Sequence, residues 1–252
     1  QKFNPKERGF LSPVNGGVSA ANFSMKRHLM FASALVMLWL FASMSFAGTI
    51  TGTVKFENRK KHGDILVFLE KVGDNKFEPP KEHAVMDQLN LVFVPFMLPV
   101  TMGTTVDFLN GDSVLHNVFT PDKVADKFNL GTWPKGEMRP YTFKKLGSTV
   151  ILCNVHPEME AYVVALPNPY FAVTDVDGKF TLPGKPNPKL ERDKRPAPPE
   201  LAAGTYLLHA WHPKGKLYTQ QVTVPEKGAA TVEITLGRGK GTNVSTIYET
   251  KK

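Results

Sequence analysis

The sequence predicts an all-β protein, and two observations lead to this prediction. Short runs of β-branched and aromatic residues alternate with polar ones, as in residues 49–56, which is the pattern of a half-buried strand. Clusters of Gly, Pro, Asn and Asp separate these runs, and such clusters favour turns. The long apolar stretch at 29–44 lies near the start of the chain and has the composition of a targeting segment.

The first 47 residues are expected to lie outside the folded part. Residues 1–24 show no hydrophobic periodicity and are predicted to be unstructured, or foreign to the natural protein. Residues 25–47 are arranged as a secretory signal peptide, with basic Met25–His28, an apolar core and small residues before Gly48. The apolar core is shorter than the ~18 to 20 residues that cross a bilayer. We therefore expect a cleaved signal and a periplasmic or otherwise exported protein, with an uncleaved signal anchor as the alternative.

The next part of the chain predicts a series of strands. Strands are expected over residues 49–56, 64–70, 104–109, 114–119, 148–153 and 161–166, with another beginning at 141–143. Residues 88–100 are apolar, but Pro95 and Pro99 confine them to a sheet edge or to bends. Residues 121–140 carry turn signals and receive no strand assignment.

The last part of the chain adds more strands. Residues 171–182 predict a hairpin around an Asp-Gly turn, and 184–200, with five prolines, predict an exposed insertion. Three strands are expected over 204–211, 217–224 and 230–236. Residues 237–252 form a basic tail that is expected to be solvated, with contact to an acidic partner or a membrane surface as the alternative.

One motif between two predicted strands predicts the chemistry. It supplies Cys153, His156 and Met159, and His116 lies further upstream. Thiolate and thioether are soft donors for Cu(I), and two His with one Cys and a weak axial Met form a blue-copper site. Taken singly, a Cys or Met is more often an apolar core residue. Their joint spacing favours copper, and an exported lone Cys has no partner in its own chain for a disulfide.

The other histidines are not expected to form a second metal site, which for His209 and His212 would require a bulge in the strand. His209 and His212 lie three positions apart in a predicted strand, so their side chains face opposite sides of the sheet. His62 and His83 are isolated in the sequence and expected to be exposed.

The segment from about residue 85 to 166 resembles the cupredoxin family of plastocyanin, pseudoazurin and amicyanin. The Cys-x-x-His-x-x-Met spacing is similar to the short ligand loop of amicyanin, and His116-Asn-Val is similar to the family's first ligand segment. The resemblance implies a Greek-key β-sandwich over residues 84–167. It also implies one type 1 copper ion bound by His116, Cys153, His156 and Met159. Asn117 is expected to brace the two ligand loops against each other, and Pro157 to stiffen the turn. Val155 departs from the family, where several members carry Pro.

The flanking segments 48–83 and 168–236 resemble a second family, the carboxypeptidase regulatory-like, transthyretin-like sandwich. The resemblance lies in Thr174-Asp-x-x-Gly-x-Phe180 followed by Gly204-Thr-Tyr. It implies a second, immunoglobulin- or transthyretin-like sandwich that the cupredoxin splits by insertion, which nearby domain termini permit. Tandem packing of the two domains is the alternative.

The net charge and the motifs of the sequence argue against two classes of function, nucleic-acid binding and catalysis. The net charge is +8, but residues 1–47 hold five Lys or Arg against one Glu, and the tail holds much of the remainder. The middle of the chain has no basic patch interleaved with aromatics, so nucleic acid is not an expected partner. No nucleophile with a neighbouring base and no phosphate loop stand out, so an enzyme is not expected.

The prediction is therefore an exported type 1 copper protein that carries one electron between redox partners. By the resemblance, the electron leaves through His156, and the partners are a c-type cytochrome, a dehydrogenase or another periplasmic oxidoreductase, or a membrane-associated electron-transfer complex. The alternatives are a periplasmic copper-handling protein and a structural adhesion module that copper stabilises.

Overall fold

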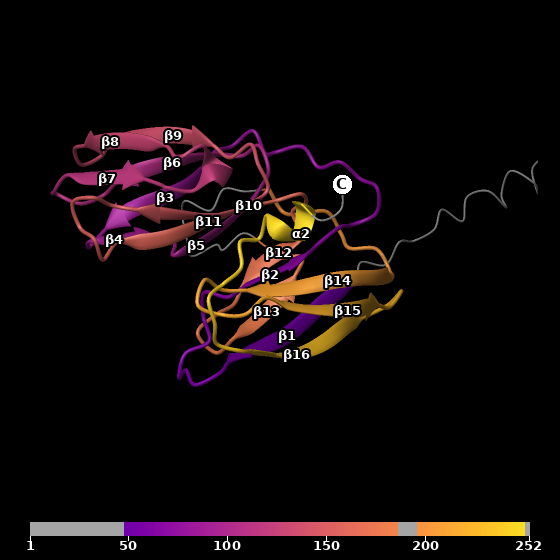
Figure 1. The fold of residues 1–252 in the computed structure, drawn as a ribbon. Coiled ribbons are helices and arrows are strands. Elements are labelled where there is room, and N and C mark those ends of the chain that lie inside the picture. The colour runs from indigo at the N-terminus through magenta and orange to yellow at the C-terminus, as the bar shows by residue number, and fades with distance from the viewer. Residues whose placement is uncertain (1–47, 186–195, 250–252) are drawn as a thin grey trace, which may run out of the picture. The chain divides into compact units, whose positions relative to one another are not determined.

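The computed structural model describes residues 48–185 and 196–249 (Figure 1). All the described residues belong to one compact unit of the chain. The predicted unstructured segment 1–24 and signal peptide 25–47 lie outside the described residues. Among those described, no helix is long and apolar enough to span a membrane.

The described residues are nearly all β, which confirms the predicted fold class. Nine strands of the middle of the chain form two sheets, in the orders β5-β11-β10-β7-β8 and β4-β3-β6-β9. The strands are β3 (Ala84–Leu89), β4 (Val92–Val94), β5 (Met97–Thr101), β6 (Thr105–Asn110), β7 (His116–Phe119), β8 (Asn129–Trp133), β9 (Met138–Thr142), β10 (Gly147–Leu152) and β11 (Glu160–Leu166), with the 3-10 turn η1 at Lys123–Ala125. We call these two sheets the ligand sandwich.

Alternating burial explains how the ligand sandwich closes. In β6 the burial pattern alternates strictly, so that Val106 and Phe108 point inward, as the two-residue period of a strand requires. They share one buried cluster with Ile151 of β10 and Ala161 of β11 from the facing sheet. Pro99 lies in β5, an edge strand of its sheet, where a missing N–H costs least, as predicted.

The remaining strands form two further sheets, in the orders β13-β1-β16 and β12-β2-β14-β15. Their bounds are β1 (Thr49–Phe56), β2 (Leu66–Leu69), β12 (Phe171–Val173), β13 (Lys179–Leu182), β14 (Gly204–Trp211), β15 (Tyr218–Val224) and β16 (Ala229–Leu236). One buried cluster, with Ile50, Leu69, Leu208 and Ile234 among its members, joins the two sheets. We call them the flanking sandwich, since β1 and β2 precede the ligand sandwich in the chain and their sheet partners follow it.

The predicted hairpin over residues 171–182 is wrong. Its turn is formed, because the Gly178 N–H donates to the carbonyl of Asp175 at 2.9 Å. However, β12 pairs with β2, and β13 pairs with β1 in the other sheet. Each strand has apolar residues to bury in the shared core, and the turn therefore carries the chain from one sheet to the other.

The C-terminal tail is also not a solvated segment. Val244 is fully buried, in a cluster with Leu66 of β2 and Val164 of β11. Asn243 accepts the Ser148 N–H at 3.1 Å and donates to the Ser148 carbonyl at 2.8 Å, and the short helix α2 (Thr246–Glu249) follows. Ser148 is near the start of β10, so the tail binds the end of β10 that is remote from Cys153.

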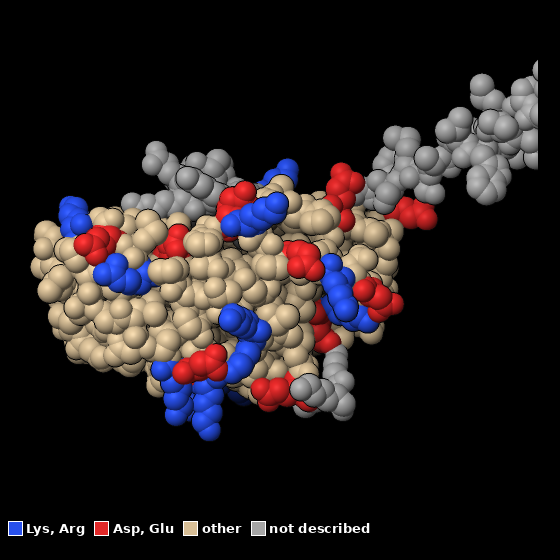
Figure 2. Space-filling model, turned by 90° about the horizontal axis from the view of Figure 1, so that it is seen from above, with Lys and Arg blue, Asp and Glu red and all other residues tan. Residues whose placement is uncertain are grey.

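Charged side chains of both signs are mixed on the face shown in Figure 2, with large uncharged areas between them. This mixing on one face accords with the near-neutral charge of the middle of the sequence.

Candidate metal centre

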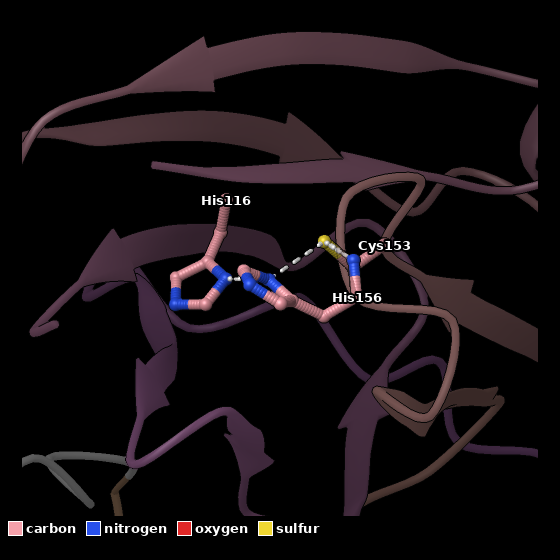
Figure 3. Close-up of side chains that lie close together, drawn as sticks. All are labelled: His116, Cys153 and His156. Atoms are coloured by element: carbon pink, nitrogen blue, oxygen red, sulfur yellow. Dashed lines mark hydrogen bonds between the residues drawn. The ribbon is translucent and has the colours of Figure 1, made fainter. Parts of the chain in front are cut away.

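Two neighbouring strands and the loop after one of them position the predicted ligands. Strands β7 and β10 are antiparallel neighbours with Leu152 opposite Phe119, so the chain leaving β10 passes the start of β7. His116 is the first residue of β7 and Cys153 directly follows β10. His156 then lies in the loop between β10 and β11, and its ring faces that of His116 (Figure 3).

The donor atoms of His116, Cys153 and His156 lie within 4.8 Å of one another. The two Nδ1 atoms are 3.0 Å apart, and Cys153 Sγ is 4.0 Å from His156 Nδ1. A metal with bonds of about 2.0 Å to nitrogen and about 2.3 Å to sulfur, in a trigonal arrangement, needs donors separated by about 3.5 to 4 Å. Small side-chain movements therefore suffice to place all three donors around one ion.

The ligand loop is held by a tight turn. The Met159 N–H donates to the His156 carbonyl at 3.0 Å, which makes residues 156–159 a β-turn with Pro157 at its second position. Proline is favoured there because its fixed φ matches the turn. Met159, the predicted thioether ligand, is fully buried in the same core cluster as Cys153.

The sulfur of Cys153 is in an environment suited to a thiolate. Cys153 is only 4% exposed, and the backbone N–H groups of Asn117 and His156 both donate to its Sγ at 3.4 Å. A buried anion needs hydrogen-bond donors or a cation to offset its lost hydration. Two N–H donors and a facing pair of imidazoles are the partners that a metal-bound thiolate requires.

His116 is fully buried and has a second polar partner. Its Nε2 lies 2.8 Å from Oδ2 of Asp112. Asn110 shapes the connecting turn, since its Nδ2 donates to the carbonyls of Val114 and Trp133 and its Oδ1 accepts the Asp112 N–H. Burial alone would raise the pKa of the Asp112 carboxyl, but hydrogen bonds from the Leu91 N–H, His116 and the Asn90 N–H outweigh it and lower this pKa.

The expected bracing role of Asn117 is not what the structure shows. Its side-chain Nδ2 donates to Asn129 Oδ1 and the Gly131 carbonyl, both at 2.9 Å and both in β8. Strands β7 and β8 change register between Asn117 and Phe119, and the side chain serves that irregular pairing. Only the backbone N–H of Asn117 reaches the ligand loop, through Cys153.

An apolar surface adjoins His156, the one ligand of the three that is partly exposed. Val155 in the ligand loop is 50% exposed, and Val114 and Leu115 in the loop before His116 are 45% and 54% exposed. Leu91, whose N–H contacts Asp112, is 41% exposed. We call these four residues the apolar rim.

Three histidines that were not predicted as metal ligands have polar partners outside the candidate metal centre. His209 bonds Glu70 and Thr219, and His83 lies 3.0 Å from Asp107. His212 lies 3.4 Å from Arg59. Among the described residues, the only group of three or more His, Cys, Asp or Glu with converging ligand atoms is that of His116, Cys153 and His156.

Sequence reasoning missed Asp112 and Asn110. The turn signal Asn110-Gly-Asp112 was visible in the sequence, but it indicated only a change of direction. The spacing of four residues between Asp112 and His116 could have suggested a carboxylate that supports a ligand imidazole.

Comparison with solved structures finds partial likeness to copper proteins of the cupredoxin class. A Cu-containing nitrite reductase from Thermus scotoductus SA-01 is 25% identical over 38% of this chain, with a TM-score of 0.32. The likeness spans only 25% of that enzyme's chain. A reduced amicyanin variant is 24% identical over 39% of this chain and 97% of its own, with a TM-score of 0.32. A purple cupredoxin from Nitrosopumilus maritimus is 25% identical over 32% of this chain and 98% of its own, with a TM-score of 0.30.

No family model matches the chain, and no curated protein matches it. The donor atoms of this chain are therefore the evidence for a metal.

Proposed function

We propose that the protein is an exported type 1 copper protein that carries single electrons between redox partners. The observation that carries the proposal is the convergence of two imidazole Nδ1 atoms and one thiol Sγ within 4.8 Å. A set of two His and one Cys with a weak axial thioether is the ligand set of blue-copper centres. Copper, when bound, would supply a one-electron couple.

The chain's own residues would do three things for that couple. His116, Cys153 and His156 would hold the ion, with Met159 as the weak fourth donor from the core. Burial of His116, Cys153 and Met159 keeps water from the ion, which limits rearrangement when the oxidation state changes. Because these donors would fill the coordination sphere, no open position would remain for a substrate, which supports a carrier over an enzyme.

His156 is the proposed route for the electron. It is the partly exposed ligand, and the apolar rim adjoins it. Exposed apolar residues gathered in one patch mark interaction sites more often than isolated ones do. A partner such as a c-type cytochrome or another periplasmic oxidoreductase would dock there without displacing a ligand.

Titration of the purified protein with Cu(II) tests the proposal. We expect one copper per chain and an intense visible thiolate-to-Cu(II) absorption that disappears on reduction. The variant His116→Ala should lose this absorption, whereas His83→Ala, a histidine variant in the same sandwich, should keep it. A colourless copper complex of the wild type would contradict the proposal.

A copper-handling protein would behave differently from an electron carrier. A carrier should exchange electrons with a small redox protein much faster than it releases Cu(I) to a chelator. Release of Cu(I) that outpaces electron exchange would contradict the carrier role and favour the handling role. Export is a proposal as well, and N-terminal sequencing of the protein secreted by a bacterial host, with Gly48 as the expected first residue, tests it.

A further inference from the structure

The carboxylate of Asp112 links the predicted ligand His116 to the turn between β3 and β4. Asp112 Oδ1 accepts the Asn90 N–H at 2.7 Å, and Oδ2 accepts the Leu91 N–H at 2.9 Å. The same Oδ2 lies 2.8 Å from His116 Nε2. The side chains of Asp112 and His116 are 13% and 0% exposed, so the contact between these two side chains is largely shielded from water.

The turn that supplies the two backbone donors has a special conformation. Asn90 and Leu91 both have positive φ, at 56° and 59°, as in the type I′ turns of two-residue hairpins. Leucine rarely adopts this conformation, so the surrounding contacts must stabilise it. The carboxylate of Asp112 provides that stabilisation, and the two N–H donors in turn prevent Asp112 from rotating away from His116.

An ionised carboxylate at Nε2 has two effects on the imidazole. It keeps the proton on Nε2, so that the lone pair is on Nδ1, the atom that faces His156 and Cys153. It also raises the basicity of Nδ1 as a metal ligand. The more highly charged Cu(II) gains more from a basic ligand than Cu(I) does, so the carboxylate favours the oxidised state.

We propose that Asp112 is a positioning residue that fixes His116 as the Nε2–H tautomer and lowers the reduction potential of the copper centre. This inference rests on the proposed copper function. It identifies the residue that sets the electronic character of one ligand, and it ties that ligand to the hairpin turn that carries part of the apolar rim.

The variant Asp112→Asn tests the proposal. The amide of Asn has only one acceptor oxygen, whereas the N–H groups of Asn90, Leu91 and the His116 ring are three donors. Its NH₂ group would therefore face one of these N–H groups. Loss of outer partners of metal ligands typically costs about 10- to 100-fold in affinity. We expect Cu(II) affinity to fall about tenfold relative to Cu(I) affinity, which for one electron raises the potential by about 59 mV.

The matched control is Asp107→Asn. Asp107 also pairs with a histidine, His83 at 3.0 Å, and the variant removes the same charge from the same sandwich without touching a predicted ligand. Its potential should stay close to that of the wild type. Equal shifts in both variants, or an unchanged potential in a folded Asp112→Asn protein, would overturn the proposal.

A measurement on the unaltered protein does not depend on the folding of a variant. Nitrogen NMR of the metal-free chain should show His116 protonated at Nε2, with a proton that exchanges slowly with water. A proton on Nδ1 would overturn the proposal. If the wild type gives no thiolate–Cu(II) absorption, the proposed function fails instead, and the tautomer result still decides whether Asp112 positions His116.

Discussion

The two sandwiches each bury histidine side chains, but they treat them differently. In the flanking sandwich, His209 is 3% exposed, and its Nε2 and Nδ1 lie 3.0 Å from Glu70 and 2.9 Å from Thr219. In the ligand sandwich, the Nδ1 of buried His116 faces a second imidazole and a cysteine. Ring nitrogens that pair only with a carboxylate and a hydroxyl indicate a structural role, whereas a ring nitrogen that converges with a second imidazole and a thiol indicates a metal site. Burial of a histidine therefore does not by itself distinguish a structural role from a metal-binding role.

Removing the sulfur ligand should produce the largest effect. The variant Cys153→Ser replaces the soft thiolate with a hard hydroxyl, and we expect Cu(II) affinity to fall by more than about 100-fold, since loss of outer partners alone costs up to that much. Equilibrium dialysis and visible spectroscopy measure this. In the flanking sandwich, His209→Ala should leave copper binding unchanged, and a loss of copper there would break the comparison.

The same His209→Ala variant should instead lower stability. It removes the imidazole beside the buried carboxylate of Glu70, and we expect the free energy of unfolding to fall by about 3 kcal/mol. Urea unfolding of the metal-free protein measures it. Metal-free Cys153→Ser should lose less stability than this, because the two side chains have nearly the same size. The reverse order would contradict the assignment of roles.

Acid should destabilise the flanking sandwich through His212. Burial, helped by Arg59 and Lys214, lowers the pKa of His212 to about 4 from its usual 6.5. Between these values the unfolded chain binds a proton that the folded protein does not, so stability falls as pH drops from about 6.5 to about 4, by up to about 3 kcal/mol. Urea unfolding at pH 7 and 4.5 should show a smaller pH effect for His212→Gln than for the wild type. An equal pH effect would exclude His212 as the cause.

Replacing the thioether should have the smallest effect of the four. Met159→Leu preserves volume in the core, so stability should change by less than about 1.5 kcal/mol. The weak axial ligand tunes the potential, and its loss should favour Cu(I) by about tenfold, a rise of about 59 mV. Voltammetry measures this, with Met86→Leu, another fully buried Met of the same cluster, as the control. Equal potentials in the two variants would remove Met159 from the ligand set.

Much of the strand pattern was predictable because local alternation controls it. Residues 49–56 and 161–166 form strands with nearly the predicted bounds. In the first segment β-branched residues alternate with polar ones, and in the second an apolar run follows turn residues. The pairing was less predictable. The turn at Asp175–Gly178 forms as expected, yet its two strands join different sheets, because partners are chosen by burial in a core that local sequence does not reveal.

The candidate site shows the same difference between features set by local sequence and features set by long-range contacts. The short spacing of Cys153, His156 and Met159 places them in one loop whatever the fold, and this could be read directly. The contact of Asp112 with the turn at Asn90 could not, since it depends on how β3, β4 and β6 lie in one sheet. The buried tail at Val244 was missed for a similar reason, because the charged residues of the tail suggested exposure, whereas Val244, Ile247 and Tyr248 pack in one apolar cluster.

X-ray absorption at the copper edge of the loaded wild-type protein tests the central claim most directly. The proposed ligand set predicts two imidazole nitrogens and one short thiolate–copper bond, with Met159 as a weak and more distant sulfur neighbour, and the short sulfur bond should be absent from the spectrum of Cys153→Ser. A wild-type spectrum with nitrogen and oxygen neighbours only would contradict the account.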